Sequence, residues 1–109
     1  MKTKIEIKIT KFQADAVEWA LGAMDDYWDG SGHGRLLGPA GPDELPRLDG
    51  TTLILSHRDD IADDLAYRVG DQLVDMTRAE AGADISEAQA GGQIRSLEAL
   101  AEKIRRAFV

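Results

Sequence analysis

Residues 51–80 constrain the fold more than any other part of this chain, because they place a buried strand directly before a long amphipathic helix. Residues 52–55 form a short β-branched and apolar run after a turn pair, and such a run predicts a strand. Ser56, followed three residues later by Asp59, has the spacing at which a hydroxyl and a carboxylate satisfy the free N–H groups of a helix start. We therefore expect one helix that continues to about residue 80.

This helix has an apolar face and an acidic face when its residues are placed at about 100° steps. The apolar face holds Ile61, Leu65, Val69, Leu73 and Met76, with Ala62 and Ala66 beside them. The opposite face holds a stripe of four aspartates: Asp60, Asp64, Asp71 and Asp75. A charged surface that only keeps a small protein in solution would explain the stripe. An acidic surface shaped for a basic partner would explain it as well.

The N-terminal part of the chain predicts a strand and a first helix. Ile5, Ile7 and Ile9 alternate with charged or polar residues, which indicates a strand with one buried face. Thr10 and Gln13 have the capping-box spacing, so we expect a helix from Lys11 to about residue 28. Its predicted core face consists of Ala14, Val17, Leu21, Met24 and Trp28.

Phe12 and Trp19 lie off this core face. Two interpretations of Trp19 remain open at the level of the sequence. Either the long loop that follows the helix covers the indole, or the indole is exposed as an anchor for another protein, since aromatic residues dominate binding hot spots.

Residues 29–50 are predicted to form a long loop, because they contain six glycines and all three prolines of the chain. Loops of this length in small domains are unusual. A tight turn over residues 48–51 would make a short strand of residues 44–48. Pro46 would confine that strand to a sheet edge, because proline has no N–H to donate.

A third helix is predicted after the central one. Gly82 is a plausible helix stop, and Ser86 with Gln89 repeats the capping-box spacing. The apolar residues of the third helix recur at steps of three and four: Ile94, Leu97, Ala101, Ile104 and Phe108, with Leu100 alongside. The short connection predicts that the last two helices form an antiparallel hairpin.

The predicted fold is α+β, a small two-layer α/β arrangement in the order strand, helix, long loop, strand, helix, helix. We expect one domain over residues 1–109, with a two- or three-stranded sheet packed by three helices. Strand direction stays open. Two strands alone are marginal, so either residues 44–48 add a third strand or a homodimer completes the sheet or the hairpin, and we expect the homodimer.

Composition narrows the classes of function. The chain has 20 acidic and 13 basic residues, with a net charge of −7, which disfavours direct binding to nucleic acid. It contains no cysteine, so disulfides and thiolate metal sites are excluded. No apolar run approaches the roughly 20 residues that span a bilayer, and the first ten residues alternate instead of forming a signal peptide. We expect a cytoplasmic protein that does not bind membranes.

Few residues carry a chemical signature. His33 and Arg35 lie in a glycine-rich segment, but phosphate-binding loops ordinarily follow a strand and precede a helix, whereas this segment follows a helix. An enzyme, or a domain that binds a ligand or a metal, would use the His33 loop together with His57 and Asp60. We predict no cofactor and no metal site, because two histidines without cysteine provide no zinc spacing.

The leading hypothesis is a small acidic protein without catalytic activity that acts by binding another protein, as an accessory or regulatory factor of a GC-rich bacterium or its phage. The residues predicted to contact the partner are Trp19, Asp60, Asp64, Tyr67, Asp71 and Asp75. A second hypothesis is an inhibitor that mimics nucleic acid through the aspartate stripe and binds a basic protein. The third is the small enzyme or ligand-binding domain built on the His33 loop.

Overall fold

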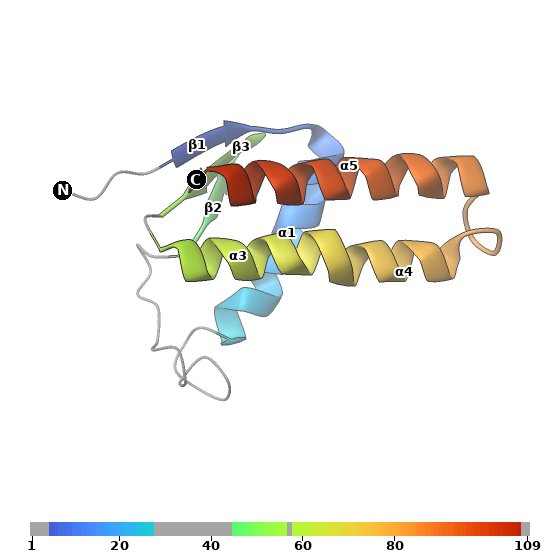
Figure 1. The fold of residues 1–109 in the computed structure, drawn as a ribbon, viewed down its shortest axis with the longest axis horizontal. Helices are drawn as coiled ribbons and strands as arrows, with labels where there is room; N and C mark the ends of the chain where they lie inside the picture. The colour runs from blue at the N-terminus through green and yellow to red at the C-terminus, as the bar shows by residue number, and fades with distance from the viewer. Residues whose placement is uncertain (1–4, 28–44, 57, 108–109) are drawn as a thin grey trace.

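The computed structural model describes residues 5–27, 45–56 and 58–107 of the chain. Figure 1 shows the order of the elements. They are β1 (Ile5–Lys8), α1 (Lys11–Tyr27), β2 (Arg47–Asp49), β3 (Thr52–Leu55), α3 (Asp59–Tyr67), the π-helical turn η1 (Arg68–Gln72), α4 (Leu73–Glu80) and α5 (Glu87–Arg106).

The three strands form an antiparallel sheet in the order β1-β3-β2. The predicted α+β fold is confirmed, and the sheet has the third strand that the sequence left open. Strand β3 is central because it is the most apolar, with Leu53, Ile54 and Leu55 all buried. The alternating strand β1 lies at one edge and exposes Glu6 and Lys8.

The turn between β2 and β3 lies one residue later than predicted. Asp49 pairs with Thr52, so Gly50 and Thr51 form the two-residue loop. Gly50 has a φ of +63°, which a tight hairpin loop requires at its first position and which glycine adopts without steric cost. The predicted strand over residues 44–48 is therefore observed over 47–49, at the other edge of the sheet.

Helix α1 begins as predicted. The Gln13 N–H donates to Thr10 Oγ1 at 3.2 Å, and Gln13 Oε1 accepts from the Thr10 N–H at 3.1 Å, which is a complete capping box. On the predicted core face Ala14, Val17 and Met24 are buried and Leu21 is partly buried, while residue 28 lies outside the described residues.

The long helix after β3 is interrupted by the π turn η1. Its buried face runs through Ile61, Leu65 and Val69 as predicted, and then continues at Val74 and Thr77. A π turn adds one residue, so the step from Val69 to the next buried position is five residues instead of four. The predicted core position is therefore wrong for Met76, which is 47% exposed, and only partly right for Leu73, which is half-buried.

The start of this helix also differs from the prediction. Arg58 occupies the N-cap position of α3 and makes no side-chain capping bond. The Ser56 hydroxyl accepts a hydrogen bond from the Arg58 N–H at 3.3 Å, a local turn that precedes the helix. Asp59 is the first residue of α3, so it does not have the third helical position that a capping box starting at Ser56 would give it.

Helix α5 folds back along α3, η1 and α4 to make the predicted antiparallel hairpin (Figure 1). The Ser86 hydroxyl caps α5 by accepting from the Gln89 N–H at 3.1 Å. On the predicted face Leu97, Leu100, Ala101 and Ile104 are buried, while residue 108 lies outside the described part of the chain. The helices approach closely at Gly70, where a Cβ would lie 2.7 Å from that of Ala101.

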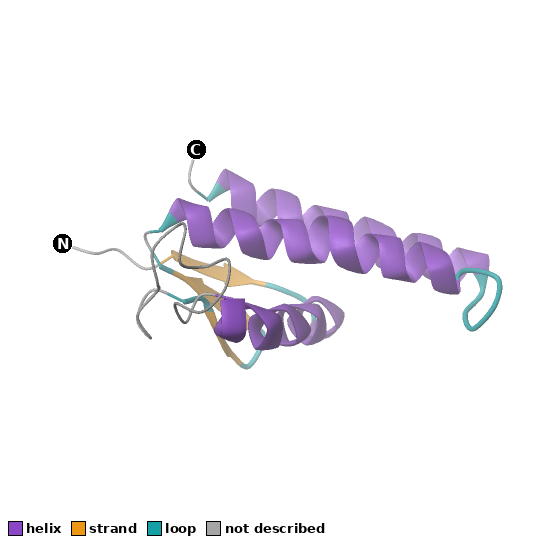
Figure 2. Ribbon diagram, turned by 90° about the horizontal axis from the view of Figure 1, so that it is seen from below, coloured by secondary structure: helices purple, strands orange, loops and turns teal. Residues whose placement is uncertain are grey.

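The sheet and α1 lie on the same side of the helical hairpin (Figure 2). Buried residues from α1, β3 and the hairpin form one core cluster. The end of the hairpin that carries the loop of residues 81–86 projects beyond both the sheet and α1 (Figures 1 and 2). No helix in the described ranges is long and apolar enough to cross a membrane.

Candidate interaction surface

An apolar groove of about 230 Å³ lies between α1 and the helical hairpin, beside their contact. We name it the aromatic groove, and it is lined by Phe12, Asp15, Ala16, Trp19, Leu73, Thr77, Gln93 and Leu97. The lining side chains come from three segments that are distant in the sequence, α1, α4 and α5. The groove therefore exists only in the folded chain.

Two partly exposed aromatic residues lie on the α1 side of the groove. Phe12 is 38% exposed and Trp19 is 41% exposed. They are seven residues apart, which places them on one side of the helix two turns from each other. The small side chain of Ala16, between them, leaves room for the hollow. Of the two interpretations of Trp19, the exposed one fits this geometry.

The floor of the groove is formed by residues of α4 and α5. Leu97 is buried and Leu73 is half-buried, while the Thr77 hydroxyl donates to the Leu73 carbonyl at 2.8 Å. The hydroxyl of Thr77 therefore has a hydrogen-bond partner within α4. A hydrogen bond from the Gln13 amide to the Ser96 carbonyl, at 2.9 Å, holds α1 against α5 beside the groove.

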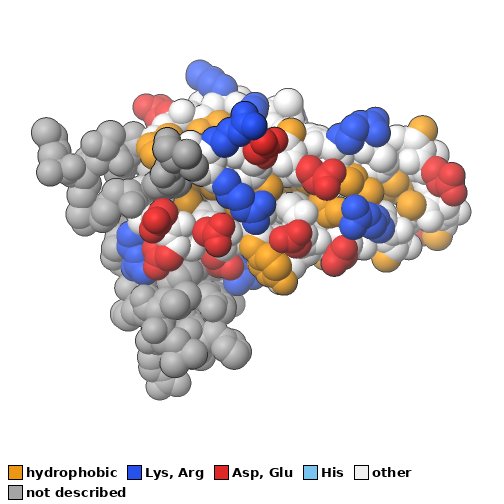
Figure 3. All heavy atoms as spheres, in the orientation of Figure 1, with side chains coloured by type: hydrophobic (Ala, Val, Ile, Leu, Met, Phe, Trp, Pro, Cys, Tyr) orange, Lys and Arg blue, Asp and Glu red, His pale blue; other side chains and the backbone are white. Residues whose placement is uncertain are grey.

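The four aspartates of the predicted stripe lie on three consecutive helical segments, with Asp60 and Asp64 in α3, Asp71 in η1 and Asp75 in α4. The extra residue in η1 turns the residues after it by about 100°, so Asp75 moves from about 60° on one side of Asp60 to about 40° on the other side. In addition, acidic and basic side chains are interleaved along the hairpin (Figure 3). Asp60, Asp71 and Asp75 are exposed and Asp64 is half-buried, and the role of the stripe in binding a partner stays a prediction.

Three of these aspartates have a cationic neighbour. Asp60 accepts two hydrogen bonds from the Arg58 guanidinium, at 2.6 and 3.1 Å. These bonds lower the pKa of Asp60 below its ordinary value, against the opposing effect of partial burial. Asp64 pairs with Arg68 at 3.1 Å and Asp75 with Arg78 at 3.5 Å.

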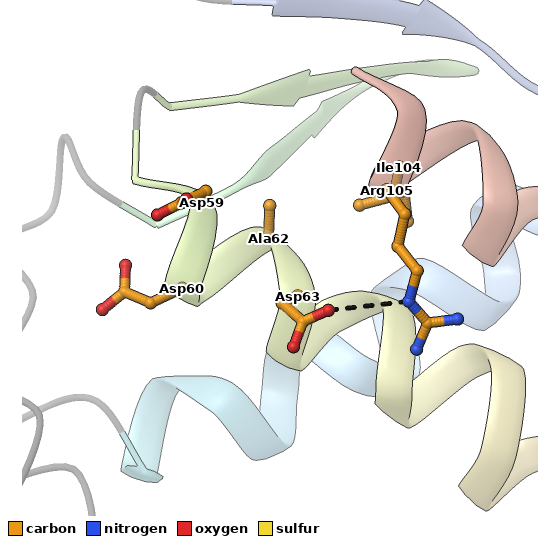
Figure 4. A pocket seen from close by; sticks show the side chains of 6 residues that line it. All are labelled: Asp59, Asp60, Ala62, Asp63, Ile104 and Arg105. Atoms are coloured by element: carbon orange, nitrogen blue, oxygen red, sulfur yellow. Dashed lines mark ion pairs between the residues drawn. The ribbon is translucent and has the colours of Figure 1, made fainter. Parts of the chain in front are cut away.

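A second hollow, of about 500 Å³, lies between the start of α3 and the end of α5. Asp59, Asp60, Asp63 and Arg105 line it (Figure 4). Asp63 pairs with Arg105 at 3.5 Å, while the carboxylates of Asp59 and Asp60 point away from Asp63 (Figure 4). Within the described residues no group of three or more potential ligands could hold a metal ion.

The remaining predicted residues divide into two groups. Tyr67 is 47% exposed at the end of α3 and does not line the aromatic groove. His33, Arg35 and His57 lie outside the described residues, so the predicted meeting of the His33 loop with Asp60 is not tested.

Sequence reasoning missed Phe12, Leu73 and Leu97 as residues of the candidate surface. The seven-residue spacing of Phe12 and Trp19 was a signal for the α1 side. Leu73 and Leu97 carried no such signal, because each also fits a helical core pattern.

Comparison with known protein families, with curated proteins and with solved structures finds no match for this chain.

Proposed function

We propose that this protein acts by binding another protein, and that the aromatic groove receives an apolar side chain of that partner. The observation that supports the proposal is the pair Phe12 and Trp19, both partly exposed beside an apolar hollow. Partly exposed aromatic rings beside a preformed hollow are the usual anchors of protein interfaces. In this proposal the protein is a small accessory or regulatory factor of the cytoplasm and is not an enzyme.

The size of the groove supports a protein partner over a small molecule. Its volume of about 230 Å³ is below the roughly 300–1,000 Å³ of typical small-molecule sites. A hollow of this size suits one or two apolar side chains. The lining also has few groups that could orient a polar ligand, namely Asp15, Thr77 and Gln93.

Mimicry of nucleic acid is less well supported. Arg58, Arg68 and Arg78 each pair with an aspartate of the predicted stripe, so the surface carries alternating charge. A mimic of a nucleic-acid backbone needs a continuous row of unpaired negative charges.

Affinity capture with variant baits tests the proposal. Trp19→Ala should lose the partner, because it removes the larger wall of the groove. Tyr67→Ala is the matched control, since Tyr67 is an aromatic residue of similar exposure outside the groove, and it should retain the partner. A bait with all four stripe aspartates changed to asparagine should retain it too.

Two results would contradict the assignment of the groove. If Trp19→Ala retains a partner that the four-asparagine bait loses, and that partner dissociates steeply with salt, the mimicry hypothesis would replace it. If Trp19→Ala and Tyr67→Ala lose the partner equally, the binding surface would lie elsewhere. Sedimentation of the purified chain identifies a second copy as the occupant, since a homodimer would then dissociate in the Trp19→Ala variant.

A further inference from the structure

Because of the π turn η1, the helix over residues 59–80 contains one residue more than a straight α-helix of the same length. Ile61, Leu65 and Val69 are buried at steps of four, with Ala62 and Ala66 buried beside them, and the next buried position after Val69 is Val74. The turn is a regular π segment of five residues, Arg68–Gln72. Such single π turns arise from the insertion of one residue into an α-helix and are frequent at functional sites.

The apolar residues after Val69 also fit a straight α-helix that lacks the π turn. In a straight α-helix, Leu73 would occupy the position of Val74, and Met76 would occupy the position of Thr77. The first replacement keeps an apolar side chain in the core, and the second puts the apolar Met76 where the polar Thr77 lies. In the described structure, by contrast, Leu73 is half-buried and Met76 is 47% exposed.

The contacts of α4 allow such a movement. The Thr77 hydroxyl bonds to the Leu73 carbonyl and Arg78 pairs with Asp75, so both interactions stay within α4 and move with it. At its far end, α4 leads into the loop of residues 81–86, where Gly82 has a φ of +82°. This loop lies on the projecting end of the hairpin (Figures 1 and 2). Backbone hydrogen bonds join residues 80–85 to one another, so the loop can move as a unit with the end of α4.

We propose that α4 has two registers, which differ by one residue and interconvert by loss of the π turn. In the described register Val74 and Thr77 face the core. In the second register Leu73 and Met76 replace them, and Thr77 becomes exposed. Because Leu73 and Thr77 line the aromatic groove, the change of register also remakes the floor of that groove. The change of register itself does not depend on whether the groove binds a protein.

The absence of cysteine allows a direct test with single-cysteine variants and a thiol-labelling reagent. Thr77→Cys reports the second register, because residue 77 is 7% exposed in the described one. Ala20→Cys is the reference for global unfolding, because Ala20 is fully buried in α1. We expect Thr77→Cys to label at least about tenfold faster than Ala20→Cys, since a local change needs less free energy than global unfolding.

A second substitution distinguishes a change of register from fraying of the helix end. Met76→Gln should slow the labelling of Thr77→Cys about tenfold, because the second register would bury the glutamine amide. In the described register residue 76 is exposed, so the variant should fold normally. Ala79→Gln is the matched control, because residue 79 is exposed on the same helix, and it should leave the labelling rate unchanged.

The proposal is overturned if Thr77→Cys and Ala20→Cys label at the same rate. It is also overturned if Met76→Gln leaves the labelling of Thr77→Cys unchanged, or slows it no more than Ala79→Gln does. Fraying alone would give either of the last two results.

Discussion

Gln13 makes both local and long-range contacts with a single side chain. Its Oε1 accepts from the Thr10 N–H, and its Nε2 donates to the Ser96 carbonyl, 83 residues away. The side chain is only 4% exposed. The local half of this arrangement was predictable from the Thr10–Gln13 spacing. The bond to Ser96 was not, because nothing in the sequence shows which carbonyl α5 presents to α1.

We predict that Gln13→Ala lowers the free energy of unfolding by about 2–3 kcal/mol, because it removes part of the cap and leaves a partly buried carbonyl without its donor. Urea denaturation followed by circular dichroism measures the loss. Gln89→Ala is the control, since Gln89 has the equivalent place in the cap of α5 but is exposed. It should cost no more than about 0.5 kcal/mol. Equal losses in the two variants would show that the bond to Ser96 adds nothing.

Among the elements, the helix over residues 59–80 shows where prediction from the sequence succeeds and where it fails. Ile61, Leu65 and Val69 were predicted in the core and are buried. The prediction fails after Val69 because Leu73 and Met76 continue a straight α-helical pattern equally well. The pattern therefore does not encode the π turn, and η1 is also where α5 approaches closely, at Gly70.

The same limit applies to the candidate site. The sequence placed Trp19 off the core face of α1 but could not decide between a covered and an exposed indole. That decision depends on α4 and α5, which form the other side of the groove.

We predict that Gly70→Ala destabilises the protein by about 1–3 kcal/mol, because the new Cβ would lie 2.7 Å from the Cβ of Ala101 and force the two helices apart. In most helices the same substitution stabilises by roughly 0.5–1 kcal/mol. The measurement is the midpoint of chemical denaturation.

Gly22 provides the matched control for Gly70, because it also lies within a helix but has no neighbouring atom within 4 Å of an added Cβ. Gly22→Ala should therefore raise the stability. The double variant Gly70→Ala with Ala101→Gly should recover most of the loss at residue 70. If Gly70→Ala stabilises the chain as Gly22→Ala does, the close approach of the helices does not determine the stability.

At the scale of the whole molecule, the α+β class, the hairpin of the last two helices and the order of the elements were predictable from periodicity and caps. The antiparallel direction of the strands was not, because the segment between α1 and β3 is long enough to allow either direction. The packing of the core is uneven along the hairpin. One end packs against α1 and the sheet, while the other projects beyond them (Figure 2).

We predict that backbone amides at the projecting end exchange with solvent sooner than those at the packed end. This end contains the C-terminal part of α4 and the first turns of α5, where Gly91 and Gly92 weaken the helix. Native-state hydrogen exchange followed by NMR should show the strongest protection around Leu65 and Leu100, which are fully buried. Uniform protection along the hairpin would show that it opens only with the rest of the chain.

The bond between Gln13 and Ser96 has a consequence for biosynthesis. The first helix emerges from the ribosome early, but the helix that holds it in place follows all the other described elements. Until α5 has left the exit tunnel, the partly built core keeps its apolar side open to water. We therefore expect the nascent chain to depend on chaperones up to that point.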